Sequence, residues 1–516
     1  MKKRNKFSLS HYKLLTTRFG VITPCCCLEV LPGDTIRMAT SAFIRVAPML
    51  APVMHPVHVT IHHWYVPFRL VWKDFEDFIT GGPDGLNTSE LPYRSVGGRV
   101  GELYDYLDIS PYNGNSTDNS NRYVNILPVR AYNLIYNEWY RDQDLEEPIP
   151  ISLESGNDNT VTSHALLRSD WERDYFTTAR PWPQKGMSVN VPVNQPQGAG
   201  PSVSGISITG TPKIDISSVA PGWSHQVIGT GDLGYNWNCD QDSYFKMNTI
   251  QRGAAGLEVT WDPGTLKVSG GEYQPGQGGI GNVDINQLRE AFALQRFEEH
   301  RAMYGSRYVE YLRYLGIKAS DARLQRPEYL GGGKQTIQFS EVLQTAEGSD
   351  PVGTLRGHGI GAMRTNRFRR FIEEHGLILS FLIIRPKAIY SNGTPRLYFK
   401  KTKEDFWQKE LEHIGQQEIY NGELYRADDN YGVFGYQNRY DEYRQHFSSV
   451  SGEFRNILDY WHLARNFSAQ PVLNSDFIAC NPSPRIFAAQ QNDHFYCMIN
   501  HSIQARRLIA KYGNPI

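Results

Sequence analysis

The chain has 516 residues, with 53 lysines and arginines against 54 aspartates and glutamates, so its formal net charge at pH 7 is −1. Aromatic residues make up 12% of the sequence, which excludes intrinsic disorder for the chain as a whole, because disordered chains are poor in such residues. The near-zero net charge argues against a protein covered with cations over its whole surface, although a local basic face stays open. Length alone predicts about two to four domains.

No run of about 18 consecutive apolar residues occurs, so no transmembrane helix is predicted. The beginning of the chain is basic but lacks an apolar run of signal-peptide length, which favours a protein used without secretion. Of the six cysteines, Cys25, Cys26 and Cys27 are contiguous, and the sequence contains no CxxC pair or zinc-type spacing. We interpret the triplet as small apolar side chains in a strand rather than as a metal or redox site. No cofactor is predicted.

Residues 1–18 form a basic N-terminal arm without an acidic residue. Its cations are Lys2, Lys3, Arg4, Lys6, Lys13 and Arg18. Such a segment is either a solvated tail or a contact for polyanions, and the sequence leaves both interpretations open. Lys2, Lys3, Arg4 and Lys6 are therefore candidates for nucleic-acid contact.

Apolar and polar residues alternate over residues 57–65, which predicts a half-buried strand with one face on a core. His58 and His62 share a face of this strand but lie about 13 Å apart, too far to bind one metal ion directly. Residues 71–79 carry apolar side chains at helical spacing and precede two glycines, which predicts a short helix. Residues 121–141 contain a second helix-like segment.

From residue 186 to residue 286 charges are sparse, no helical period is present, and loops rich in glycine and proline separate short alternating runs. A segment this long predicts an elaborated surface insertion. A helix is predicted over residues 284–315, where apolar residues recur at helical spacing. The last third mixes strands, such as residues 377–385, with loops rich in tyrosine.

Most catalytic signatures are absent from the sequence. Residues 331–335 resemble a phosphate-binding loop, but Gln335 stands where Mg²⁺ coordination requires serine or threonine. The sequence has no GxSxG or HExxH motif, and no GxGxxG that opens a βαβ unit. Spacing alone does not exclude a pair of carboxylates of the glycosidase type. We interpret the chain as a protein that is not an enzyme.

One basic cluster interleaves arginines with phenylalanines between residues 364 and 371. Its arginines are Arg364, Arg367, Arg369 and Arg370. This pattern suits contact with a phosphate backbone combined with stacking on bases. The alternative is that the arginines pair with the acidic residues that follow, Glu373 and Glu374.

Several segments, in order over nearly the whole chain, carry a resemblance to a known family. They are residues 29–35, 51–55, 66–82, 174–177, 181–186, 305–308, 321–333 and 434–437. The longest reads Val-Pro-Phe-Arg-Leu-Val-Trp-Lys-Asp-Phe-Glu-Asp-Phe-Ile-Thr-Gly-Gly. Together they resemble the major capsid protein of the Microviridae, small icosahedral single-stranded DNA phages, and most closely its gokushovirus-like branch.

The resemblance implies a mainly β protein: one eight-stranded antiparallel jelly roll over residues 1–516, with long insertion loops that contain short helices and extra strands. It implies sixty copies in a T=1 shell around a circular single-stranded DNA, assembled in the cytoplasm of the bacterial host. The insertion at residues 187–285 is expected to build protrusions at the three-fold axes and to contribute to host attachment. The expected partners are further copies of the chain, the genomic DNA, a small basic DNA-packaging protein, minor proteins of the pilot or spike type, and a host receptor.

The alternative function is that of a carbohydrate-binding or glycan-cleaving β-protein of a phage. The missing repeats and catalytic signatures, together with the capsid-type segments, favour the capsid interpretation. The excess length then belongs to one sandwich with insertions rather than to several domains. The cations of the N-terminal arm and of residues 364–370 become DNA-facing candidates.

Overall fold

The computed structural model describes most of the chain in detail. The described ranges are residues 4–83, 86–96, 100–110, 123–186, 285–304, 320–322, 324–343, 353–426 and 429–511, with the short stretches 207–209, 238–239, 245–246, 267–269, 310, 313–314 and 345. The chain divides into two compact units, one made of Met1–Val189 and Phe292–Ile516 and the other of Asn190–Ala291. The second unit nearly coincides with the expected insertion at 187–285, whose role as a protrusion stays a prediction.

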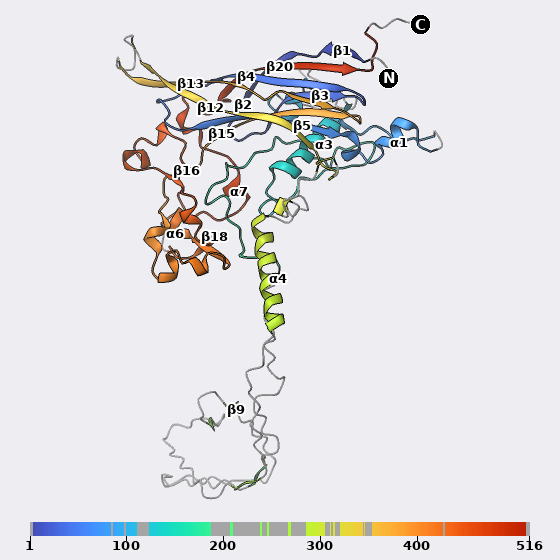
Figure 1. The fold of residues 1–516 in the computed structure, drawn as a ribbon. Helices are drawn as coiled ribbons and strands as arrows, with labels where there is room; N and C mark the ends of the chain where they lie inside the picture. The colour runs from blue at the N-terminus through green and yellow to red at the C-terminus, as the bar shows by residue number, and fades with distance from the viewer. Residues whose placement is uncertain are drawn as a thin grey trace, which may run out of the picture. The chain divides into compact units, whose positions relative to one another are not determined.

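Eight long antiparallel strands build the first unit (Figure 1). They are β2 (His11–Thr17), β3 (Thr23–Val30), β4 (Thr35–Val46), β5 (Val57–Pro67), β12 (Glu328–Leu343), β13 (Leu355–Arg364), β15 (Gly376–Pro386) and β20 (Phe495–Arg507). Four pair in the order β2–β20–β4–β13, here called the β20 sheet, and four in the order β3–β15–β5–β12, here called the β15 sheet. The β12–β13 pair joins the two sheets. Numbered along the chain, these orders are 1-8-3-6 and 2-7-4-5, the order of a jelly roll, so the predicted fold class is confirmed.

The two sheets enclose a core of side chains that alternate along each strand. In β20, Phe495, Cys497 and Ile499 are buried while the residues between them are exposed or half-buried. They pack in one cluster with Ile44 of β4 and Ile61 of β5. Burying such side chains stabilises the fold by about 1.5–3 kcal/mol each.

A second core covers the other face of the β15 sheet. It joins Trp64 of β5 and Phe381 of β15 to Val129 and Tyr132 of helix α3 (Leu127–Ile135). The prediction that β5 has one face on a core is therefore wrong, because most of its residues are buried on both sides. The cause is the long connection between β5 and β12, which folds back over a sheet face too apolar to meet water.

The remaining elements are short, apart from helix α4 with 20 residues. The helices are α1 (Phe75–Thr80), α2 (Leu103–Tyr106), α4 (Ile285–Tyr304), α6 (Asn421–Leu424) and α7 (Ser475–Ile478), and the strands are β1 (Asn5–Ser8), β6 (Tyr93–Ser95), β7 (Tyr123–Asn125), β8 (Ser207–Thr209), β9 (Asn238–Cys239), β10 (Phe245–Lys246), β11 (Lys267–Ser269), β14 (Phe368–Phe371), β16 (Ile389–Tyr390), β17 (Gln416–Tyr420), β18 (Val433–Asn438) and β19 (Ser448–Ser449). Helix α1 ends at Gly81, whose φ of 86° lies in the left-handed region that glycine adopts readily. No helix in the described part of the chain is both long and apolar enough to cross a membrane.

The N-terminal arm is not a solvated tail where the structure describes it. Both β1 and β2 pair with β20, and Asn5 stands opposite Arg507. Lys13 forms an ion pair with Asp108, with 2.8 Å between Nζ and Oδ1. The composition did not reveal this pairing, because an edge strand can carry many polar residues.

The histidines of β5 bind neighbouring side chains, as expected for structural residues. The ring nitrogens of His63 lie 2.7 Å from Ser380 Oγ and 3.2 Å from Thr365 Oγ1. His58 Nδ1 lies 2.8 Å from Glu172 Oε1, and His62 Nδ1 lies 2.7 Å from the hydroxyl of Tyr140. Burial lowers the pKa of His63 to about 3, so the ring is neutral in the folded protein.

Candidate nucleic-acid interface

The solvent-facing side of the β20 sheet gathers cations from four separate parts of the chain. We call this side the cationic face. Its cations are Arg4, Lys6, Arg37, Arg45, Arg364, Arg369 and Arg506, all of them exposed. They come from residues 4–6, from β4, from β13 with its continuation β14, and from β20. The sheet brings them together because strands far apart in sequence are neighbours in a jelly roll.

Strand register places several of these cations side by side. Lys6 stands opposite Arg506, and Arg37 stands opposite Arg369. Directly opposite residues have Cβ atoms about 4.5–5.5 Å apart, and like charges at that distance destabilise a sheet. A face that keeps such pairs at its surface is suited to a polyanion that neutralises them.

No acidic residue lies on the cationic face among the residues that the structure describes. Two carboxylates near its border, Asp34 and Asp493, are already paired. Asp34 Oδ2 lies 3.0 Å from Arg507 Nε, and Asp493 Oδ1 lies 2.9 Å from Arg18 Nε. The positive charge of the face is therefore not cancelled within the described chain.

The side chain of Arg4 is fixed on the cationic face by three contacts. Its guanidinium donates hydrogen bonds to the carbonyl oxygen of Gly33 at 3.0 Å and to Thr35 Oγ1 at 2.9 Å. The guanidinium carbon also lies 5.5 Å from the ring centroid of Phe371, a cation–π distance. Arg4 is thus fixed on the sheet rather than carried on a free tail.

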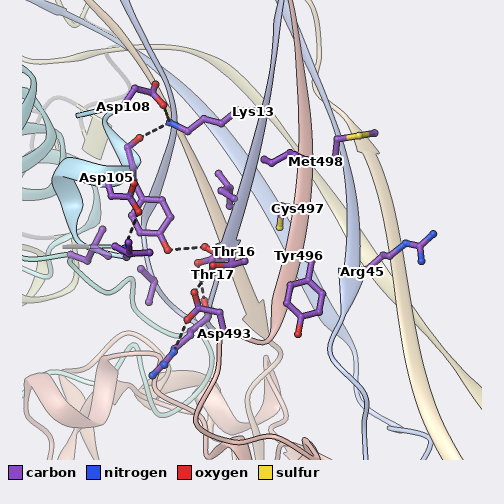
Figure 2. Close-up of a pocket in the computed structure, with 18 of the residues that line it drawn as sticks. Lys13, Thr16, Thr17, Arg45, Asp105, Asp108, Asp493, Tyr496, Cys497 and Met498 are labelled. Atoms are coloured by element: carbon purple, nitrogen blue, oxygen red, sulfur yellow. Dashed lines mark hydrogen bonds and ion pairs between the residues drawn. The ribbon is translucent and has the colours of Figure 1, made fainter. Parts of the chain in front are cut away.

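Toward the other end of the same strands the cationic face becomes apolar. Leu14, Met498 and Phe43 occupy one row across β2, β20 and β4, and Thr16, Tyr496 and Arg45 occupy the next. A groove with a volume of about 1260 Å³ runs beside these rows, between β2 and the segment that contains α2. Figure 2 shows Lys13 directed at Asp108 in this groove, with Tyr496, Met498 and Arg45 on the neighbouring strands.

The DNA-facing candidates predicted from the sequence do not all lie on the cationic face. Arg4, Lys6, Arg364 and Arg369 lie on the cationic face, and Arg367 is exposed in the connection between β13 and β14. Lys2 and Lys3 lie outside the described residues. For every one of these candidates, contact with nucleic acid stays a prediction.

Arg370 is turned to the other side of β14. Its partner across the strands is Ile36, which is buried, and its guanidinium lies 2.9 Å from Glu328 Oε1. The alternation of a strand separates it from its neighbour Arg369. The expected pairing with an acid thus occurs for Arg370, but with Glu328 from another strand rather than with Glu373 or Glu374.

Two exposed arginines of the face, Arg37 and Arg45, were not predicted from the sequence, whereas Arg506 stands in a short basic cluster at residues 506–511. Arg37 and Arg45 each stand alone among apolar residues in a strand, so neither forms a cluster in sequence. A signal was nevertheless present, because a single cation at an alternating position of an apolar strand must point away from the core. Only the register shows that these residues are neighbours.

One group of potential metal ligands lies behind the cationic face in the described part of the chain: His11, Cys26 and His501, with ligand atoms within 4.8 Å of one another. Both ring nitrogens of His501 are already bonded, at 2.9 Å to Thr40 Oγ1 and at 2.9 Å to the carbonyl oxygen of Cys25. Burial raises the pKa of the Cys26 thiol well above its usual value. Metal binding requires a free nitrogen and a thiolate, so these residues fit a packed core better than a metal site.

Comparison with known proteins agrees with this architecture. The profile of a family described as capsid protein (F protein) matches residues 1–516. Capsid protein VP1 of Bdellovibrio phage phiMH2K is 34% identical over 506 residues, which cover 95% of this chain and 91% of the relative. Capsid protein VP1 of Chlamydia phage 1 is 31% identical over 577 aligned positions, covering 99% and 95%. Capsid protein VP1 of Spiroplasma virus 4 is 29% identical, covering 92% and 87%.

These matches confirm the resemblance stated for the sequence and favour a structural role over an enzymatic one. They extend over the strands of the jelly roll and over the long connections between them. The chain therefore belongs to the capsid protein (F protein) family of Microviridae-type single-stranded DNA phages.

Proposed function

We propose that the chain is the major capsid subunit of a small phage and that sixty copies assemble into a T=1 shell around a circular single-stranded DNA. The cationic face lies toward the genome in this shell. The subunit resides in the virion and assembles in the cytoplasm of its bacterial host. Sixty chains of 58.8 kDa have a combined mass of about 3.5 MDa.

The observation that carries the DNA-contact part of this proposal is the acid-free cationic face. A chain with a net charge of −1 concentrates seven exposed cations on one side of one sheet. Cations arranged in this way bind phosphates of any sequence, because counterions released from the nucleic acid supply the free energy. A container must accept the whole genome, so binding that does not depend on sequence suits this role.

The remaining parts of the proposal concern partners. The insertion at residues 187–285 contributes to host attachment from protrusions at the three-fold axes, and the receptor is a component of the host surface. A small basic DNA-packaging protein and minor proteins of the pilot or spike type complete the virion. Support for these parts comes from the resemblance stated for the sequence.

Expression of the full chain tests the assembly. Electron microscopy and native mass measurement should show small isometric particles with a protein mass near 3.5 MDa. Particles with genome packaged should lose DNA at raised salt more readily once cations of the cationic face are removed. Monomers or fibrous trimers that cleave glycans would instead support the alternative of a glycan-cleaving phage protein and refute the capsid proposal.

A further inference from the structure

The groove beside β2 is exposed, apolar in its floor and balanced in charge. The apolar side chains that line it include Tyr12, Leu14, Phe43, Val100, Tyr496 and Met498. Tyr12 is 69% exposed and Leu14 78% exposed, values unusual for large apolar residues on a sheet. Exposed apolar side chains gathered at one place indicate a binding surface.

The polar residues of the groove leave it without net charge. Lys13, Arg18 and Arg45 stand against Asp105, Asp108 and Asp493. Two of the aspartates are held by ion pairs within the chain, Asp108 with Lys13 and Asp493 with Arg18. Asp105 Oδ2 accepts a hydrogen bond from the backbone N–H of Gly101 at 2.9 Å. The groove is therefore a poor site for a phosphate and a better one for a neutral, flat group.

The groove is continuous with the cationic face. Tyr12 shares one row across the sheet with Asn500, Ser41 and Arg364. Neighbouring strands are about 4.8 Å apart, so this row extends about 14 Å from the tyrosine to the arginine. Arg37 lies farther along β4, and Arg369 stands opposite it on β14. A bound polymer whose anionic groups lie on the arginines can therefore place its side groups on the aromatic residues of the groove.

From this juxtaposition we infer that the groove binds the bases of unpaired nucleotides whose phosphates lie on the cationic face. This inference rests on the proposed function and specifies how the strand is held. Unpaired bases are neutral and planar, and they stack on aromatic side chains irrespective of sequence. The exposed aromatic rings that can stack on bases are those of Tyr12 and Tyr496, whereas the ring of Phe43 already has the guanidinium of Arg45 at 5.6 Å from its centroid.

Two other occupants fit the observations less well. A duplex turns its bases inward and presents mainly phosphates, so it would leave the apolar floor in water. A second copy of the chain would have to supply carboxylates to Arg364, Arg369 and Arg37 as well as an apolar wedge to the groove. A single strand meets both requirements with one molecule, phosphate for the arginines and base for the groove.

The test compares two probes on the full chain kept as unassembled subunits. One probe is a deoxycytidine strand of about 12 nucleotides, within the site sizes of single-strand binding folds. The other is a strand of equal length whose sugars carry no bases. Fluorescence anisotropy should show that the strand with bases binds more tightly, and that Tyr12→Ala or Tyr496→Ala weakens its binding about 5- to 150-fold. Tyr12→Phe should retain the affinity, and neither alanine variant should change binding of the base-free strand.

Tyr398→Ala is the matched control, because Tyr398 is 73% exposed but lies in the connection between β16 and β17, outside both the face and the groove. Equal affinity for the two strands in the wild-type chain would overturn the groove inference while leaving the cationic face and the proposed function intact. Binding of neither strand would overturn both. Variants of Tyr12 and Tyr496 that impair assembly without DNA yet bind the cytidine strand normally would assign the groove to a second copy and also overturn the inference.

Discussion

Arg37 of β4 and Arg369 of β14 stand directly opposite each other in an antiparallel pair, and both side chains are exposed. Neither forms an ion pair within the described part of the chain, although the chain as a whole is slightly acidic. A like-charged pair at this position lowers the stability of the sheet. Retaining it is consistent with a polyanion that binds over both guanidinium groups.

Removing this pair should weaken DNA binding and reduce its dependence on salt. For Arg37→Gln combined with Arg369→Gln, the slope of log K against log salt should become less negative by about 1.4, since each contact with a single strand contributes about 0.7. Binding of a single-stranded oligonucleotide measured from low to high salt checks this value. Arg370→Gln is the control on the same strand, because Arg370 pairs with Glu328 on the other side. An equal change in slope for the control would contradict the assignment of the face.

The fold should lose stability in acid because of histidines enclosed between the sheets. Burial lowers the pKa of His63 to about 3 and that of His501 to about 4, below the ordinary value of 6.5. The unfolded chain therefore binds more protons, and stability that is fully present above pH 6.5 is lost as the pH falls toward 4. Each histidine should lower the free energy of unfolding by up to about 1.4 kcal/mol per pH unit in this window.

Denaturant unfolding of the unassembled chain at pH 7 and pH 5 measures this loss. His63→Gln should reduce the difference between the two pH values, although it lowers stability at pH 7 because Ser380 and Thr365 lose a partner. His358→Gln is the control, since this ring is only half-buried and bonded to Ser340 at the surface. An unchanged pH difference in the His63 variant would show that this ring does not govern the acid response.

Asp170 should have the opposite effect on stability, which it lowers as the pH rises. Its burial and the neighbouring carboxylates of Glu146 and Asp142 raise its pKa to about 8, and Oδ1 has no hydrogen-bond partner among the described residues. The folded state favours the protonated carboxyl, so its contribution is present below pH 3.8 and is lost as the pH rises through about 8. Asp170→Asn should therefore raise the Tm at pH 9 more than at pH 5. The exposed residue Asp476 provides a control through Asp476→Asn, which should shift neither value.

The ion pair between Arg130 and Asp158 should be costly to break. Their side chains are 0% and 1% exposed, with 2.9 Å between Nη2 and Oδ2, and Arg130 also donates to the carbonyl oxygens of Val71 and Glu154. Arg130→Met should lower the free energy of unfolding by about 3–5 kcal/mol, because it leaves a buried charge without a partner. Arg130→Met with Asp158→Leu should recover part of the loss in chemical denaturation. A double variant less stable than the single one would contradict this explanation.

Much of the fold could be predicted from local patterns. Apolar residues in β15 and alternating residues in β5 mark strands, and two glycines after residues 71–79 mark the end of α1. The number of covered faces on β5 could not be predicted, because it depends on where a connection more than 200 residues long returns to the sheet. The pairing of the N-terminal strands could not be predicted for a similar reason, since their partner β20 lies at the other end of the chain.

Some residues of the candidate site, but not all, could be predicted from the sequence. Arg364 and Arg369 stand in a cluster, and Arg4 and Lys6 in a basic arm, so composition was enough to select them. Arg370 belongs to the same cluster but faces Glu328, and only strand alternation with a fixed register separates it from Arg369. Arg37 and Arg45 carry no local signal beyond a polar residue at an alternating position.

The sequence by itself determined that this protein is neutral, rich in aromatics and strands, and built on the plan of a capsid subunit. It did not show where the charged residues lie on the surface, because the net charge of a chain contains no information about their positions in space. The tertiary structure decided this by pairing β20 with β1, β2 and β4, and β4 with β13 and β14. That pairing places cations from both ends and the middle of the chain on one acid-free face. The physical reason is that hydrogen bonds between strands act across any sequence separation, whereas composition and periodicity describe only neighbours along the chain.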